Sequence, residues 1–166
     1  MKMELIQPFI NAADAVLSQG LKSPMSIGNL AMEPVAYRRQ GVAAVIELTG
    51  DIEGRVIFDL APKTAAQVAS HFAGTELPET DDLVREAVCE LANQVIGNAV
   101  ATLNDQGFHF RVHPPQMHTS EQGPTSTEDT GARAVLRDRE RQRIYEYCVA
   151  LCAEGLGGRS VREFSF

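Results

Sequence analysis

Apolar and polar positions follow a helical period most clearly between residues 82 and 103. Apolar residues recur there at spacings of three and four, which places them on one face of a helix. They are Val84, Val88, Leu91, Val95 and Ala99. A second stripe, at spacings of four, three and four, consists of Glu86, Glu90, Asn93 and Gly97. Because successive helical residues are rotated by about 100°, the two stripes point in nearly opposite directions.

The polar stripe has an unusual composition for a helix face that only meets water. It places the carboxylate of Glu90 one turn before the carboxamide of Asn93, and Gly97 one turn after it. A glycine inside a helix costs about 1 kcal/mol relative to alanine. The missing side chain would let another molecule lie close to the helix beside Asn93. The alternative interpretation is a solvated helix face with a tolerated glycine, and the spacing alone does not separate the two.

The rest of the chain predicts further helices and several strands. Apolar spacing predicts a helix over 2–20, and a proline near the start and a glycine at the end predict a short helix over 62–74. Residues rich in β-branched side chains predict a hairpin of 41–49 and 53–60 and a second hairpin of 132–138 and 143–153. The segment 108–113 alternates and predicts another strand. Residues 21–39 contain breakers and predict a short strand or two.

This order of elements predicts an α+β fold in one domain covering residues 1–166. We expect a largely antiparallel sheet with the long helices packed on one face, an exposed loop over 120–131, and a tail over 155–166 that is loose or adds an edge strand. Both halves begin with a helix and continue in antiparallel strands, which leaves an internal duplication open. Glu4 and Gln7 repeat the spacing of Glu90 and Asn93, but Pro8 follows at once and no glycine matches Gly97.

Composition narrows the classes of function. A chain of 166 residues with 44% hydrophobic and 22% charged residues fits one globular domain with a real core. A net charge of −7 and the absence of a basic run argue against a nucleic-acid partner. No stretch reaches the roughly 18 apolar residues of a membrane span, and no signal peptide is recognisable. We therefore expect a cytoplasmic protein with no membrane contact.

The cysteines and histidines do not predict a catalytic or metal site. Cys89, Cys148 and Cys152 are odd in number and lack paired metal-type spacing, so we interpret them as structural thiols. His109 and His113 differ by four residues, which in a strand separates them by about 13 Å. No glycine-rich phosphate loop or nucleophile elbow is present. We expect no metal bound by this chain.

One segment resembles a known family. Residues 90–98, Glu-Leu-Ala-Asn-Gln-Val-Ile-Gly-Asn, are similar to the Glu-x-x-Asn helix motif, followed by a glycine, of the CheC/CheX/FliY phosphatases of bacterial chemotaxis. The Val-Ile-Phe-Asp-Leu-Ala-Pro strand before it, the short helix and the later strand ending in Pro114-Pro115 follow the family's order. The resemblance covers roughly 3–153. A single motif resembles CheX rather than CheC, which usually carries two.

The resemblance implies a reaction and a role for each residue of the motif. Its members hydrolyse the aspartyl-phosphate of a CheY-like response regulator. By that resemblance Asn93 orients the attacking water and Glu90 docks on the regulator's active-site lysine. Gln94 and Gly97 are expected to contact the partner. Where the family often has serine or aspartate this chain has Glu86, which we expect to tune docking.

The resemblance also sets expectations for cofactors and assembly. No cofactor is expected on this chain, whereas the regulator would hold its own Mg²⁺. A homodimer joined through the sheets is expected as well, and Pro114 and Pro115 are given no role. The alternative hypothesis is a non-catalytic module of the same fold that docks a signalling partner without changing the lifetime of its phosphoryl group.

Overall fold

The computed structural model describes residues 3–33, 41–51, 54–118, 131–138 and 144–150. Three helices lie in these segments: α1 (Met3–Leu21), α2 (Pro62–Ala73) and α3 (Asp82–Asp105). The strands are β1 (Met25–Glu33), β2 (Val42–Gly50), β3 (Gly54–Leu60), β4 (Phe110–Val112), β5 (Gln116–His118), β6 (Gly131–Asp138) and β7 (Ile144–Ala150). No helix in these segments is both long enough and apolar enough to cross a membrane.

The strands form one antiparallel sheet of seven strands in the order β1-β6-β7-β3-β2-β4, with β5 also paired to β2. The two predicted hairpins are both present, as β2–β3 and β6–β7. They join through β3 and β7, where Ile57 lies opposite Cys148. In the sheet the β6–β7 hairpin therefore lies between β1 and β3, although in the sequence it follows both of these strands.

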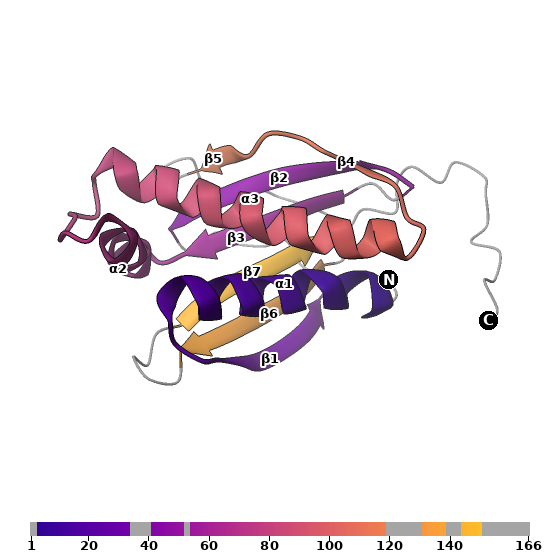
Figure 1. Ribbon diagram of the computed structural model, residues 1–166, viewed down its shortest axis with the longest axis horizontal. Coiled ribbons are helices and arrows are strands. Elements are labelled where there is room, and N and C mark those ends of the chain that lie inside the picture. Colours follow the sequence, from indigo (N-terminus) through magenta and orange to yellow (C-terminus); the bar gives the residue numbers. More distant parts are fainter. Residues whose placement is uncertain (1–2, 34–40, 52–53, 119–130, 139–143, 151–166) are drawn as a thin grey trace.

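The two long helices lie next to each other on one face of this sheet (Figure 1). Helix α1 packs on β1 and β6, while α3 packs on β2 and β3. The short helix α2 lies against α3 at one end of the sheet. This arrangement confirms the predicted α+β fold with helices on one face. The internal duplication stays a hypothesis.

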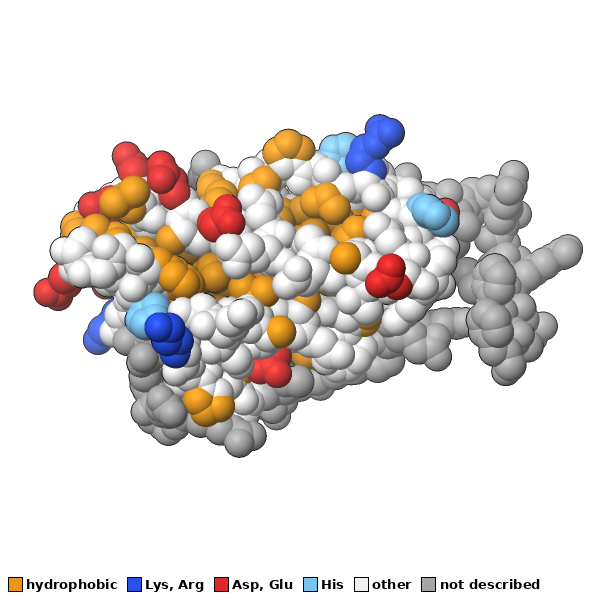
Figure 2. Space-filling view, viewed as in Figure 1, with side chains coloured by type: hydrophobic (Ala, Val, Ile, Leu, Met, Phe, Trp, Pro, Cys, Tyr) orange, Lys and Arg blue, Asp and Glu red, His pale blue; other side chains and the backbone are white. Residues whose placement is uncertain are grey.

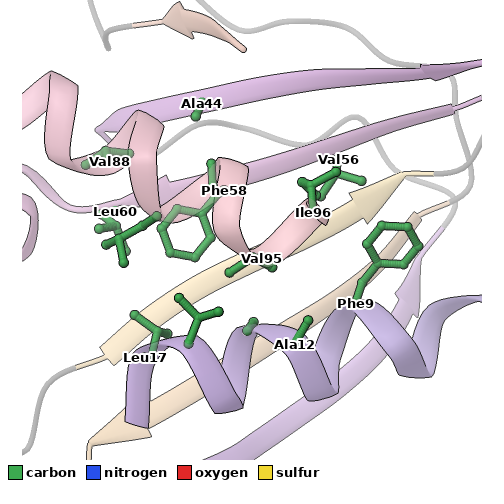
Figure 3. Close-up of a cluster of buried hydrophobic side chains, with 14 of the residues drawn as sticks. Phe9, Ala12, Leu17, Ala44, Val56, Phe58, Leu60, Val88, Val95 and Ile96 are labelled. Carbon is green, nitrogen blue, oxygen red and sulfur yellow. The ribbon is translucent and has the colours of Figure 1, made fainter. Parts of the chain in front are cut away.

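The core lies between the helices and the sheet (Figure 3). Phe9 of α1 and Phe58 of β3 are fully buried there, and Val95 of α3 lies between the two layers. Removing apolar side chains of this size from water stabilises the fold by about 1.5–3 kcal/mol each. The buried side of α3 is thus fixed on the sheet, which leaves its opposite side facing outward.

Local sequence accounts for where α3 begins. Asp81 precedes the helix in extended conformation, and its Oδ1 accepts a hydrogen bond of 2.9 Å from the backbone N–H of Leu83. An aspartate in this position satisfies an N–H group that has no partner within the helix. The cap holds the first turn of α3 in place, and with it the orientation of the polar stripe.

The predicted strand over 108–113 is shorter in the structure. Phe108 N–H instead donates to the carbonyl of Leu103 at the end of α3, at 3.0 Å. His109 N–H donates to the carboxylate of Asp51, which follows β2, at 2.7 Å. Only Phe110–Val112 pairs with β2. Strand β5 was not predicted, and the segment 21–39 contributes the single strand β1 to the described residues. Most of the predicted loop over 120–131, the tail over 155–166 and Cys152 lie outside the described residues.

Candidate functional site

Helix α3 has the two opposite faces that its sequence predicts. The apolar positions are buried, and Val84, Val88, Val95 and Ala99 are completely so. The polar stripe is exposed along its whole length; it comprises Glu86, Glu90, Asn93 and Gly97. A stripe held from behind by a packed face keeps a fixed direction, because the helix cannot rotate without exposing its core positions.

The carboxamide of Asn93 is exposed and makes no hydrogen bond with any residue that the structure describes. A carboxamide both donates and accepts hydrogen bonds. Both functions of Asn93 are therefore available to a water molecule or to another protein.

Glu90 has one partner on its own helix. The side-chain amide of Gln94 donates to Oε1 of Glu90 at 2.9 Å, one turn along α3. An exposed pair of this kind contributes only a few tenths of a kcal/mol, about 0.2–0.5. Its consequence is geometric, since it restricts the rotation of the carboxylate while Oε2 has no such partner among the described residues. Gln94, expected to contact a partner, thus also orients Glu90.

Gly97 is not required by the packing of this chain. A Cβ atom added there would meet no atom within 4 Å, and the residue has ordinary helical geometry. Gly41 is a useful contrast, because a Cβ there would lie 2.5 Å from the carbonyl oxygen of Leu60. The helix therefore loses about 1 kcal/mol at Gly97, and no packing contact with the described residues requires the glycine.

Helix α1 carries polar residues at a similar spacing, but the side-chain amide of its Gln7 is not free. Gln7 is exposed, but its amide donates to Oδ1 of Asn11 at 2.8 Å. Asn11 follows Gln7 by four residues, as Gly97 follows Asn93. In α1 a side chain thus occupies the position that is empty in α3, and it binds the amide that would correspond to Asn93. Only α3 presents an open stripe among the described helices.

Two histidines make polar contacts within the fold, and Cys89 is a free cysteine. His113 Nε2 lies 3.0 Å from the hydroxyl of Thr49, and His109 Nδ1 lies 3.4 Å from Asp51. In the described segments no three His, Cys, Asp or Glu side chains gather as a metal site would require. Burial raises the pKa of the Cys89 thiol, which is the opposite of what a thiolate nucleophile needs. Neither residue type competes with the α3 stripe as a site.

Asp51 is a residue that the sequence did not single out. Its carboxylate accepts from His109 N–H, and its own N–H donates to the carbonyl of His109 at 3.0 Å. Asp51 thereby ties the end of β2 to the segment after α3. The position of Asp51 next to Gly50, at the end of a predicted strand, indicates only a turn. No local sequence pattern identifies its partner His109, which is 58 residues away.

The fold and the stripe together define a class of protein. It is an α+β domain whose long surface helix presents a carboxylate, a free carboxamide and an empty glycine position on its exposed face.

A match to a family model identifies the family within this class of protein. Residues 42–137 match the model for the chemotaxis phosphatase CheX, and this segment contains the whole of α3. The match covers more than half of the chain, so the protein belongs to the CheX family. The resemblance found from the motif is thereby confirmed.

Individual relatives agree with that assignment. The CheY-P phosphatase CheX of Thermotoga maritima is 35% identical over 77 residues, which are 46% of this chain and 50% of that protein. The alignment thus spans only half the length of that relative. The crystal structure of a chemotaxis protein CheX from Desulfovibrio desulfuricans shows the same fold, with a TM-score of 0.76 at 21% identity over 90% of this chain and 100% of that chain. The CheX-CheY-BeF3-Mg²⁺ complex from Borrelia burgdorferi gives a TM-score of 0.74 at 26% identity, over 90% of this chain and 99% of that chain.

Proposed function

We propose that this protein accelerates hydrolysis of the aspartyl-phosphate of a CheY-like response regulator. The observation that carries the proposal is the exposed, unbonded carboxamide of Asn93, held on a fixed helix beside Glu90. Membership of the CheX family supports it, as does the Borrelia burgdorferi CheX that forms a complex with CheY. The regulator acts in the cytoplasm, so the proposal places this protein there too.

The proposed reaction requires the phosphatase to supply only one component that the regulator lacks. An acyl phosphate hydrolyses by itself in water, and the regulator carries its own Mg²⁺, which neutralises charge on the phosphoryl oxygens. The missing component is a water molecule held in line with the phosphorus–oxygen bond that breaks. Water adds to phosphorus, the aspartate leaves as a carboxylate, and inorganic phosphate is released.

Asn93 suits the positioning of that water. Its side-chain oxygen accepts a hydrogen bond from water, and its amide donates to a phosphoryl oxygen or to water. A carboxylate in this position would repel the anionic phosphoryl group. Because Asn93 makes no bond within the described chain, no internal contact has to break before it enters the regulator.

Glu90 has the complementary task of docking. Its charge suits the regulator's active-site lysine, and Gln94 holds one of its oxygens so that the other can point outward. Glu86, one turn earlier and exposed, lies nearer the rim of the stripe and tunes docking. Gly97 leaves room for the regulator's loops beside Asn93.

The same account includes a homodimer. Among the described strands, β1 and the β4–β5 side form the two edges of the sheet. An unpaired edge offers backbone N–H and C=O groups to a second copy. Light scattering on the purified protein tests this part of the proposal, and a monomer at micromolar concentration would contradict it.

The test of the activity is phosphate release from a panel of the host's phosphorylated regulators. We expect the wild-type protein to shorten the lifetime of at least one phosphorylated regulator, and Asn93→Ala to abolish that effect. Asn98→Ala is the matched control, because Asn98 is also an exposed asparagine of α3 but lies outside the stripe. Tight binding with an unchanged lifetime would instead identify a non-catalytic docking module.

A further inference from the structure

We propose that Leu83 is an apolar anchor that packs against the regulator and extends the docking surface about two turns beyond Glu90. The inference rests on the proposed function, because it uses the same partner. It adds to that function a residue outside the Glu-x-x-Asn motif, with a role in affinity rather than in chemistry.

Leu83 is exposed without a structural need. Its relative exposure is 48%, the highest of the large hydrophobic residues that the structure describes as exposed. It lies in the first turn of α3, where acidic or small polar residues suit the helix better. The hydrogen bond from its N–H to Asp81 fixes the backbone of Leu83, so the side chain projects from a rigid helix turn.

Leu83 is also aligned with the motif. Leu83, Glu90 and Gly97 are spaced by seven residues, and a helix drifts by only about 20° over seven residues. They therefore lie along one strip of α3, with Leu83 about 10.5 Å from Glu90 along the helix axis. A specific interface covers about 800 Å² on each partner, which is a patch of about 16 Å radius. A regulator centred on Glu90 and Asn93 would cover Leu83 too.

The charges around Leu83 favour this occupant over a second copy of the chain. Asp82, with a side chain 85% exposed, and the exposed Glu86 flank it. Between residues 76 and 90 the only basic residue is Arg85, which lies 3.4 Å from Asp82. Figure 2 shows hydrophobic and acidic side chains together at the end of the molecule where α3 begins. Two such surfaces would repel each other, whereas a partner that offers a lysine to Glu90 is attracted.

The test separates docking from chemistry with the Leu83→Gln variant. Glutamine keeps helix propensity and removes the apolar surface. Binding is measured with the host's CheY-like regulator loaded with BeF₃⁻ and Mg²⁺, and dephosphorylation is measured over a range of regulator concentrations. Val112→Thr is the control, because Val112 is also an exposed aliphatic residue, at 39%, but lies on β4 away from the strip.

We expect Leu83→Gln to raise both the dissociation constant and the half-saturating concentration about three- to tenfold, which is the loss expected when half a leucine is no longer buried. The maximal rate should change less than twofold, and Val112→Thr should change neither value. Unchanged affinity in Leu83→Gln, or an equal loss in Val112→Thr, would overturn the inference. Activity that persists in Asn93→Ala would overturn the proposed function instead, and the binding result on Leu83 would still be decided separately.

Discussion

Replacement of Gly97 should make the protein more stable and less active. The site for a side chain is open, since a Cβ atom there meets nothing within 4 Å. Gly97→Ala should therefore recover the helix propensity that glycine loses, about 1 kcal/mol. For a chain of this size that corresponds to a rise of about 2–4 °C in the midpoint of thermal unfolding.

A longer side chain at Gly97 tests why the glycine is there. Gly97→Gln should also stabilise α3, by about half as much as alanine. Its side chain would hold the regulator away from Asn93, and a displacement of about 1 Å at a reacting group costs about 10²-fold in rate. We thus expect dephosphorylation to fall by about that factor in Gly97→Gln and by much less in Gly97→Ala.

Urea unfolding and regulator dephosphorylation measure the two effects on the same samples. The control is Ala15→Gln, because Ala15 is an exposed small residue of α1, outside the stripe. It should leave the dephosphorylation rate unchanged. Full activity in a folded Gly97→Gln protein would refute the idea that the glycine admits a partner, and a loss of stability in Gly97→Ala would refute the open geometry.

Three further predictions address docking and the core. Glu90→Gln keeps the shape of the side chain but removes its charge, so affinity for the BeF₃⁻-loaded regulator should fall about ten- to a hundredfold, as for a lost charged hydrogen bond; unchanged affinity by calorimetry would exclude the lysine contact. Raising NaCl from about 0.05 to 0.5 M should lower kcat/KM several-fold with little effect on kcat, because the acidic start of α3 is exposed and screened; a salt-independent kcat/KM would contradict this. Phe9→Ala should lower the free energy of unfolding by about 3–5 kcal/mol, because the ring is fully buried; a loss below 1 kcal/mol in urea titrations would contradict the packing of α1.

The faces of α3 were predictable because a helix has one period and the segment follows it over its whole length. The same holds for the β2–β3 hairpin, where adjacent strands with β-branched residues are joined by a short connection. The α+β architecture follows from these local elements in their order. The exposure of Glu90 and Asn93 follows from the burial of Val88 and Val95 on the opposite side.

The features that the sequence does not predict depend on contacts between distant segments of the chain. The pairing of β3 with β7 joins residues about 90 positions apart, and no local pattern specifies it. Asp51 and His109 likewise meet only in the folded chain, and their contact shortens the strand predicted over 108–113. At the site, the open space at Gly97 could not be predicted, since it requires knowing that none of the described elements packs on α3 there.

The measurement that tests the central claim most directly follows binding and phosphoryl lifetime together for Asn93→Ala. Alanine raises helix propensity, so this variant should fold at least as well as the wild type. With the regulator saturated, we predict that affinity stays within a few-fold of wild type while the phosphorylated regulator decays at its intrinsic rate, a loss of about 10²-fold or more. A saturated Asn93→Ala complex that still loses phosphate at the wild-type rate would contradict the account.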